Sequence, residues 1–173
     1  MSGERTGGGV VHRFGDGIDT DMLAPGRLMK RPIDDLAAAC LEALDPGFAT
    51  RVRPGDVIVA GGNFGTGSSR EQAAQVLLTL GIAAVLARSF ARIFYRNALN
   101  LGLPVLVCPA AVEIPSGIRL AVDPIAGRAR ELDGAGQDTG RSWTCEPLPD
   151  HLMTMIADGG LLPHLAKRLA KRA

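Results

Sequence analysis

Residues 61–73 of this chain read Gly-Gly-Asn-Phe-Gly-Thr-Gly-Ser-Ser-Arg-Glu-Gln-Ala. They follow residues 56–60, an aspartate and four apolar residues in a pattern typical of a buried strand, and lead into an apolar pattern at 73–80, which predicts a helix. A glycine-dense turn between a strand and a helix lets the backbone approach a ligand closely and directs the helix N-terminus at it. Two serines and an arginine are then predicted in the first turn of that helix, an arrangement that suits a small, multiply charged anion.

The same residues have a purely structural interpretation. Ser68 and Glu71 are spaced as a capping box, in which each side chain satisfies a backbone donor near the other. A capping box does not explain the second serine, Ser69, or the density of glycine. Nor does it explain Arg70, a cation placed where the helix dipole disfavours positive charge. These features favour an anion site over a structural turn.

Two common phosphate-binding motifs do not match this turn. A P-loop requires Gly-Lys-Ser/Thr after its glycines, and the nearest lysine is Lys30. In a dinucleotide fingerprint that starts at Gly65, Arg70 would occupy the position of the last glycine. The acidic residue required about twenty positions further on is also missing at 86–89. The sequence therefore argues against a nucleotide-binding protein.

Length and composition narrow the class of protein. A chain of 173 residues with 46% hydrophobic content predicts a single domain at residues 10–173, after a polar, glycine-rich leader at 1–9 that we expect to be flexible. The formal net charge of +1 and the 4% aromatic content argue against nucleic acid as a partner. Neither a membrane-spanning apolar run nor a signal-peptide pattern occurs, so we expect a cytoplasmic protein that has no membrane partner.

Cysteine and aspartate spacing predicts no metal in this chain. Cys40, Cys108 and Cys145 are far apart, whereas an iron–sulfur cluster needs three or four positioned thiolates. The first two fall in apolar patterns and are predicted to be reduced core residues, and Cys145 is expected to be partly exposed. Asp19 and Asp21 could hold a divalent cation, but two carboxylates without further spaced oxygen ligands are weak evidence for calcium.

Hydrophobic periodicity predicts an α/β order with parallel pairing over the first two thirds of the chain. Strands are expected at 10–14, 56–60, 82–87 and 104–108, and helices at 33–44, 73–80 and 91–101. Ser89 is the expected N-cap of the last of these helices. Its two arginines, Arg92 and Arg96, are interpreted as solvated surface charges.

The remaining third has a different pattern. Short strands are expected at 119–123, 129–132 and 142–145, and helices at 149–157 and 161–172. These strands predict a small, partly antiparallel second sheet.

Four segments in order along the chain resemble a known family. Residues 15–21, 44–48, 63–73 and 88–98, the last followed by 102–105, resemble the small, swivelling subunit of the aconitase superfamily, above all the small subunits of 3-isopropylmalate dehydratase and homoaconitase. The resemblance implies that residues 10–173 form a single α/β swivel domain of the β/β/α type. Such a domain has a mostly parallel central sheet with helices and a small second sheet.

The same resemblance implies an activity. It implies one half of a heterodimeric hydro-lyase that isomerises a 2-hydroxy di- or tricarboxylate by dehydration and rehydration, with 3-isopropylmalate of leucine biosynthesis as the first choice of substrate. The alternatives are homoaconitate, citramalate or another methylated malate, and a non-catalytic module that binds a carboxylate. Loss of hydroxide requires a Lewis acid. The implied partner is therefore a large catalytic subunit with a [4Fe-4S] cluster, and no cofactor is implied in this chain.

Residue roles also follow from the resemblance. Ser68 is implied as the proton-transferring alkoxide, stabilised by backbone N–H groups, a helix N-terminus and a guanidinium. Ser69 would contact the substrate, and Arg70 would bind a substrate carboxylate bidentately. The implied supporting residues are Asp21, Asn63, Gly65, Thr66 and Gly67. For Asp21, a turn-capping role is an equally simple alternative.

A basic loop is predicted at 22–31, where prolines disfavour a helix. In the resembled family this loop closes over the substrate, which implies Arg27, Lys30 and Arg31 as substrate-binding residues. Isopropylmalate enzymes typically have Tyr-Leu-Arg-Thr here, whereas this chain has Leu-Met-Lys-Arg at 28–31. A cation for a distal carboxylate remains and the aromatic ring is lost, so the choice among hydroxy acids stays open.

Two residues depart from the family pattern in or next to the turn. Thr66 stands where the family often has cysteine, and it keeps a small polar group there. Gln72 stands where the family often has histidine, and an amide cannot transfer protons as an imidazole does. We interpret both as variation between subfamilies.

Overall fold

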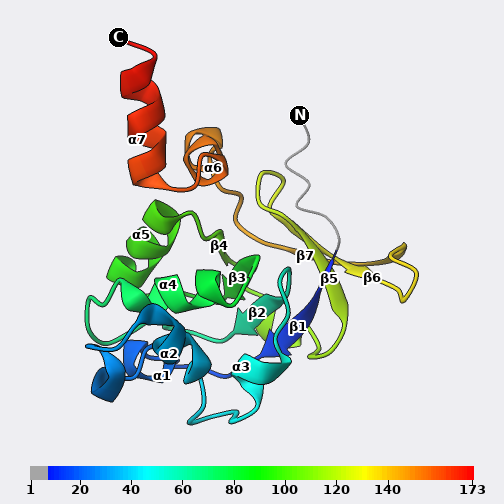
Figure 1. Ribbon diagram of the computed structural model, residues 1–173. Helices are drawn as coiled ribbons and strands as arrows, with labels where there is room; N and C mark the ends of the chain where they lie inside the picture. Colours follow the sequence, from blue (N-terminus) through cyan, green and yellow to red (C-terminus); the bar gives the residue numbers. More distant parts are fainter. Residues whose placement is uncertain (1–7) are drawn as a thin grey trace.

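In the computed structural model, which describes residues 8–173, the strands form a seven-stranded sheet (Figure 1). Their order across the sheet is β4-β3-β2-β1-β5-β6-β7. The strands are β1 (Gly9–Arg13), β2 (Val57–Ala60), β3 (Ala84–Ala87), β4 (Val105–Val107), β5 (Arg119–Asp123), β6 (Arg128–Leu132) and β7 (Asp138–Thr144). Of the leader expected at 1–9, residues 1–7 lie outside the described part, and Gly9 already belongs to β1.

Strands β1 to β4 make up the parallel half of the sheet. Val11 pairs with Val57, Val57 with Ala84, and Val85 with Val105. Every residue of β2 and β3 is buried, as expected for strands covered on both faces. The apolar runs that predicted these strands are therefore explained by their central position.

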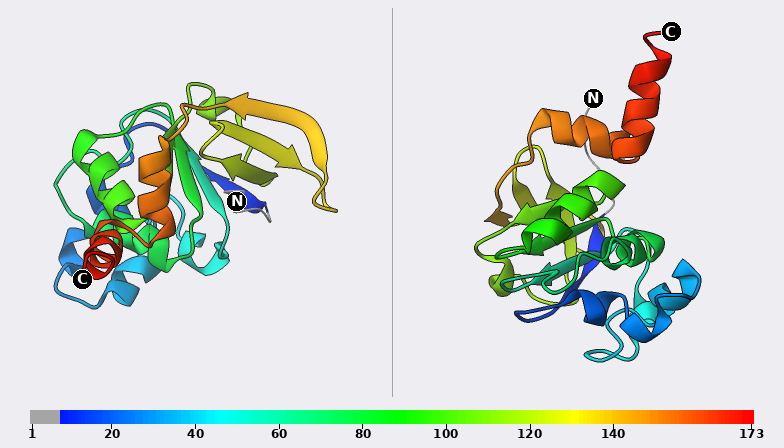
Figure 2. Two further views of the ribbon diagram at one scale, coloured as in Figure 1. Left: turned by 90° about the horizontal axis from the view of Figure 1, so that it is seen from above. Right: turned by 90° about the vertical axis from the view of Figure 1, so that its left-hand side faces the viewer.

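Strand β1 joins the two halves, because it pairs in parallel with β2 and antiparallel with β5. From β5 the chain continues as an antiparallel meander through β6 and β7, which curves away from the parallel strands (Figure 2). The predicted α/β class is confirmed, but the antiparallel strands do not form the expected second sheet, because pairing of β1 with β5 joins them to the parallel strands in one sheet. Strand β7 begins at Asp138, earlier than expected, because its first residues are polar and exposed and show no hydrophobic pattern.

Helices flank the parallel half, and α4 contacts α1, α2 and α5. Helices α6 and α7 lie at one end of the molecule, where α7 projects away from the body (Figure 1, Figure 2). The α-helices are α1 (Thr20–Leu23), α2 (Ile33–Ala38), α3 (Phe48–Arg51), α4 (Gln72–Thr79), α5 (Arg92–Leu101), α6 (Asp150–Ala157) and α7 (Leu161–Ala170). The 3-10 helices are η1 (Gly26–Leu28) and η2 (Ala111–Glu113). No described helix is long and apolar enough to cross a membrane.

The helix predicted at 33–44 was too long. Helix α2 ends at Ala38, and the chain then turns through Leu41, whose φ of 58° lies in the left-handed region. The backbone N–H of Leu41 donates to the carbonyl of Met22 at 2.8 Å, which explains why the helix cannot continue. Leu41 is buried as a result, whereas Leu44, at the end of the predicted helix, is 49% exposed.

Three further expectations were wrong or incomplete. Ser89 does not cap α5, since Ala91 occupies the N-cap position and offers no side-chain bond. Cys145 is only 4% exposed, because it lies in the core that also holds Cys40 and Cys108. The loop predicted at 22–31 contains the short η1 helix, in which Leu28 N donates to the Pro25 carbonyl and Met29 N to the Gly26 carbonyl.

Candidate functional site

The candidate site lies at the edge where the parallel strands β1, β2 and β3 end, which we call the carboxyl-end edge (Figure 1). The glycine-rich turn at 61–71, called the signature turn below, leaves β2 at this edge. Two isolated bridges tie it to the segments that follow the neighbouring strands, Asp19 with Thr66 and Phe64 with Phe90. Open parallel sheets bind their ligands outside this edge.

The backbone of the signature turn depends on glycine at two positions. Gly65 has a φ of 83°, and a Cβ on it would lie 2.1 Å from Cγ of Phe94. Gly67 has a φ of 111°, and a Cβ there would lie 2.9 Å from Oγ1 of Thr20. Both conformation and space therefore exclude a side chain. Asn63 also has a positive φ, of 57°, which asparagine tolerates better than most residues.

Ser68 is exposed and is held by Thr20 of α1. Its backbone N–H donates to Thr20 Oγ1 at 3.1 Å, and its own Oγ lies 3.2 Å from the same oxygen. Thr20 is buried, and its backbone N–H donates to the carbonyl of Thr66. Sequence reasoning missed Thr20, although the quoted block at 15–21 contains it between two aspartates.

The expected capping box does not form. Helix α4 begins at Gln72, with Glu71 in the N-cap position, and no side chain bonds to the helix end. The two serines and Arg70 therefore precede the helix, where we had expected them within its first turn. The reason is tertiary, since Thr20 accepts the backbone N–H of Ser68 and so holds the serine outside the helix.

Arg70 is fixed by two acceptors from the segment of α1. Its Nη1 donates to Asp21 Oδ1 at 3.1 Å and to the carbonyl of Ala24 at 3.1 Å. Asp21 Oδ1 also accepts the backbone N–H of Gly26 at 2.8 Å, so this carboxylate both caps a turn and contacts the arginine. The bond from Gly26 and the guanidinium of Arg70 hold the pKa of Asp21 below its ordinary value. The carboxylate is therefore charged at neutral pH.

The three cations proposed for the loop are arranged differently. Arg27 forms an ion pair with Glu42, and Arg31 Nε donates to Asp35 Oδ2 at 2.9 Å. Lys30 is exposed and makes no ion pair with any described residue. All three lie in the exposed segment between α1 and α2, and two are engaged by acidic residues of the following segment. Among the described residues, none of the three forms a hydrogen bond or an ion pair with the signature turn.

Two side chains that sequence reasoning missed, Asn97 and Ser89, support the turn. Asn97 of α5 donates from Nδ2 to the carbonyl of Ser69 at 3.4 Å. Ser89 Oγ accepts the backbone N–H of Asn63 at 2.8 Å. Beside this contact lies an open polar hollow of about 360 Å³, lined by Asp16, Gly62, Asn63, Arg88 and Ser89. No motif marked Asn97 or Ser89 for these roles, because their partners are backbone atoms distant in sequence.

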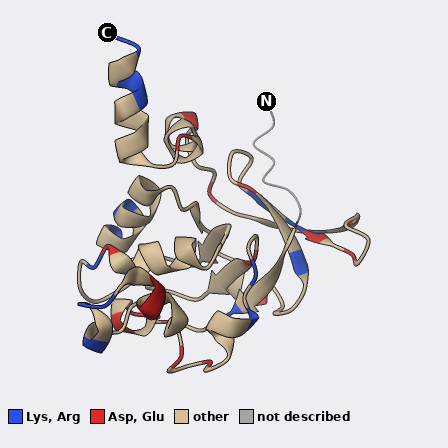
Figure 3. Cartoon of the chain, viewed as in Figure 1, with Lys and Arg blue, Asp and Glu red and all other residues tan. Residues whose placement is uncertain are grey.

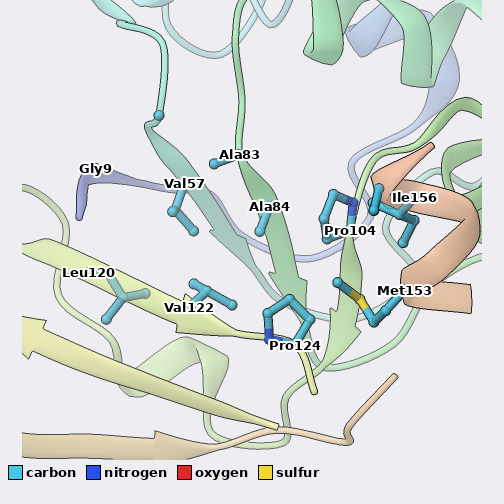
Figure 4. Close-up of a pocket in the computed structure, with 12 residues that line it drawn as sticks. Gly9, Val57, Ala83, Ala84, Pro104, Leu120, Val122, Pro124, Met153 and Ile156 are labelled. Carbon is cyan, nitrogen blue, oxygen red and sulfur yellow. The ribbon is translucent and has the colours of Figure 1, made fainter. Parts of the chain in front are cut away.

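An apolar cavity of about 100 Å³ lies at the opposite edge, where β2, β3 and β4 begin (Figure 4). Its lining carries no polar side chain, and Met153 and Ile156 of α6 cover one side of it. A multiply charged anion would lose its hydration there without gaining hydrogen bonds. This cavity therefore does not suit the expected ligand.

The two aspartates considered for a divalent cation have separate partners. Asp19 Oδ1 accepts the backbone N–H of Met22 at 2.7 Å, as the N-cap of α1, while Asp21 faces Arg70. Within residues 8–173, no three side chains of histidine, cysteine, aspartate or glutamate gather as metal ligands would.

Known proteins resemble this chain in sequence and structure. The Aconitase C-terminal domain family matches residues 33–110. The methanogen homoaconitase small subunit of Methanothermobacter thermautotrophicus is 45% identical over 162 residues, which cover 93% of this chain and 91% of that protein. The 3-isopropylmalate dehydratase small subunit 1 of Methanopyrus kandleri is 49% identical over 162 residues, which cover 92% of each chain.

A solved structure extends the comparison to the fold. The 3-isopropylmalate dehydratase of Methanocaldococcus jannaschii superposes with a TM-score of 0.84 at 39% identity and covers 95% of both chains. The 2,3-dimethylmalate dehydratase small subunit of Eubacterium barkeri is 43% identical over 160 residues, 91% of this chain and 94% of that one. Identity at this level, over nearly the whole length of each relative, places the chain: it belongs to the aconitase-related family of dehydratase small subunits.

Proposed function

We propose that this chain supplies the proton-transferring half of a two-chain hydro-lyase that isomerises 3-isopropylmalate by dehydration and rehydration. The observation that carries the proposal is that Ser68, exposed, and Arg70 project from one signature turn, and that α1 holds both. Relatives named for 3-isopropylmalate, for homoaconitate and for 2,3-dimethylmalate lie within a narrow range of identity, so a homologous hydroxy acid is the second candidate.

Ser68 is the group we assign to proton transfer at carbon. Thr20 Oγ1 accepts the backbone N–H of Ser68 and lies 3.2 Å from Ser68 Oγ, so once Ser68 is an alkoxide only the Thr20 hydroxyl can donate in this pair. A hydrogen bond to the charged form of a group favours that form. Thr20 therefore stabilises the serine alkoxide, and the guanidinium of Arg70 two residues later adds to this effect.

Arg70 is the group we assign to a substrate carboxylate. Asp21 and the Ala24 carbonyl engage Nη1, so the remaining N–H groups are available to a ligand. Arginine stays protonated in proteins and matches a carboxylate with two parallel hydrogen bonds. Asp21 consequently orients the guanidinium without removing its charge. Ser69, Lys30 and the turn residues Asn63, Thr66 and Gly67 complete the proposed binding surface.

The cofactor is assigned to the partner. Expulsion of hydroxide calls for a Lewis acid, and we assign this to a [4Fe-4S] cluster on a large subunit. The thiols of this chain do not suit a cluster: Cys40 follows α2, Cys108 follows β4 and Cys145 follows β7, and all three are buried in the core. Burial also raises the pKa of Cys40, which disfavours a ligating thiolate. This chain would therefore be active only in complex with its large subunit.

Anaerobic reconstitution with the large subunit of the same organism tests the proposal. Formation of the unsaturated diacid would be followed by ultraviolet absorbance with 3-isopropylmalate, citramalate, 2,3-dimethylmalate and homocitrate. We expect turnover of 3-isopropylmalate, and a fall in kcat of about 10³-fold for Ser68→Ala, in the range of a lost general base. Ser142→Ala, which alters an exposed serine of β7, is the matched control and should leave kcat unchanged.

Two results would contradict the proposal. If Ser68→Ala remained active, Ser68 would not be the proton-transferring group. A stable complex that turns over none of the four acids would favour the alternative of a carboxylate-binding module.

A further inference from the structure

Helix α5 presents an exposed face whose charges have no function in the fold. Arg92 and Arg96 are one turn apart and therefore lie on the same side of the helix. Both are exposed, and neither forms an ion pair within residues 8–173. Ile93, beside them, is 43% exposed. We call these three residues the α5 face, and Figure 3 shows the blue segments on this helix.

The position of Arg92 does not favour the helix that carries it. It is the first residue of α5, where the helix dipole is unfavourable to a positive charge. The first turn holds no acidic residue, and no side chain caps the helix end. If Arg92 served only as a solvated surface charge, it would be equally well solvated at the C-terminal end of α5, where the helix dipole would also stabilise it. The arrangement therefore points to a contact outside this chain.

The α5 face is continuous with the candidate site. The N–H of Ala91 donates to the carbonyl of Phe64 at 2.9 Å, so α5 begins against the signature turn. Further along the helix, Phe94 packs on Phe64 with ring centroids 5.2 Å apart, and Asn97 donates to the carbonyl of Ser69. A protein that covers Ser69 from outside must pass close to the start of α5.

We propose that the α5 face is a docking surface for the large subunit, which presents carboxylates to Arg92 and Arg96 and an apolar contact to Ile93. This inference rests on the proposed two-chain enzyme. Exposed Arg88, which lines the polar hollow at the same edge, adds a third cation that makes no ion pair among the described residues. Arginine is enriched at protein interfaces, where paired charges determine the partner and its orientation.

The test measures the dissociation constant between the two purified subunits under anaerobic conditions. We expect Arg92→Glu combined with Arg96→Glu to weaken binding by about 30-fold or more, because reversed charges would face the carboxylates of the partner. The matched control is Arg168→Glu with Arg172→Glu, an exposed arginine pair with the same spacing at the end of α7. That control should leave the dissociation constant within about twofold of the wild-type value.

Folding and catalysis provide two internal checks. Glutamate near the start of α5 suits the helix dipole, so the Tm of the double variant should equal or exceed that of the wild type. At a saturating concentration of the large subunit, kcat and the KM for the diacid should return to wild-type values, because neither arginine contacts substrate in this proposal.

Each contrary outcome has its own meaning. An unchanged dissociation constant for the double variant would overturn the docking surface, while wild-type turnover left the proposed enzyme intact. A raised KM at a saturating concentration of the large subunit would overturn docking in favour of substrate binding by the two arginines. If the wild-type subunits formed no complex, both the docking surface and the two-chain enzyme would fall.

Discussion

The two edges of the parallel half of the sheet differ in whether their polar side chains are buried and paired or exposed. At the edge where the strands begin, which we call the amino-end edge, Asp56 is buried and paired with buried His12, and an apolar cavity lies at the same edge. At the carboxyl-end edge, serines and arginines are exposed, and several have no side-chain partner in the described structure. One edge therefore contributes stability, and the other leaves donors and acceptors available to a ligand.

Asp56 shows how the amino-end edge is stabilised. Its carboxylate accepts the backbone N–H groups of Val10 at 3.0 Å and Arg53 at 2.9 Å, and it lies 2.8 Å from His12 Nε2. The imidazole of His12 in turn packs edge-on against Phe48, with ring centroids 5.2 Å apart. Buried polar groups at this edge are satisfied, so they tie β1 and β2 together and offer nothing to a ligand.

The carboxyl-end edge is shaped by its backbone. The N–H of Gly65 donates to the carbonyl of Ile18 at 2.7 Å, and the N–H of Thr20 donates to the carbonyl of Thr66 at 2.8 Å. These main-chain bonds shape the turn, so the side chain of Ser69 remains available to a ligand, as does that of Lys30 in the segment between α1 and α2. The difference teaches that the candidate site combines glycine geometry with support from the side chains of Thr20, Ser89 and Asn97. The opposite edge relies on the buried hydrogen bonds of Asp56.

The largest expected effect comes from Gly65→Ala. The new Cβ would lie 2.1 Å from a ring carbon of Phe94, and alanine would adopt a φ of 83°. Overpacking and left-handed strain together should cost about 3–5 kcal/mol in the free energy of unfolding and should abolish turnover. Urea denaturation and the reconstituted assay measure both quantities.

The control for this variant lies at the other edge. Gly55 also has a positive φ, of 97°, but a Cβ on it would meet no atom within 4 Å. Gly55→Ala should therefore cost only the conformational strain, about 1–2 kcal/mol, and leave turnover intact. Equal losses from both variants would show that the two edges do not differ in this way.

A smaller effect is expected from Asp56→Asn. The amide keeps one acceptor oxygen in place of two, so at least one of the donors from Val10, Arg53 and His12 loses its partner in a buried site. We expect a loss of about 2–4 kcal/mol in the free energy of unfolding, with kcat per folded molecule unchanged. Chemical denaturation and active-site-normalised turnover provide the two measurements.

Asp133→Asn is the matched control for exposure. Asp133 likewise accepts two backbone N–H groups, from Ala135 and Gln137, but it lies in an exposed turn. Both bonds end on the same oxygen, Oδ1, which the amide keeps, and water can solvate the new NH2 group. The loss should therefore stay below about 0.5 kcal/mol, less than the net value of one hydrogen bond. A kcat that fell with Asp56→Asn would mean that the amino-end edge takes part in catalysis after all.

Much of the fold could be predicted from the sequence, because the central strands β2 and β3 are short apolar runs in which every residue is buried. The signature turn was also predictable as a candidate site, since its glycines, serines and arginine are consecutive. The bounds of β5 matched the expected 119–123, because its short apolar run is flanked by turn residues.

The parts that could not be predicted depend on contacts between distant residues. Thr20 is 48 positions from Ser68, and no local pattern relates a buried threonine to the exposed serine that it holds. The same contact prevents the capping box whose spacing was present in the sequence. Leu41 adopts a left-handed conformation because its N–H bonds to Met22, whereas leucine alone favours a continuing helix.

The smallest effect is expected from filling the apolar cavity. Ala84 lines it at the start of β3 (Figure 4), so Ala84→Val would place two methyl groups in empty space and would suit a strand. The free energy of unfolding should rise by about 0.5–1 kcal/mol, with kcat unchanged.

Ala87→Val at the other end of the same strand is the matched control, because Ala87 is fully buried outside that cavity, and overpacking there should cost about 1–3 kcal/mol. A higher free energy of unfolding for Ala84→Val and a lower one for Ala87→Val would show that the two edges differ in packing as well as in polarity. A loss from both variants would instead mean that the cavity at the amino-end edge closes in solution.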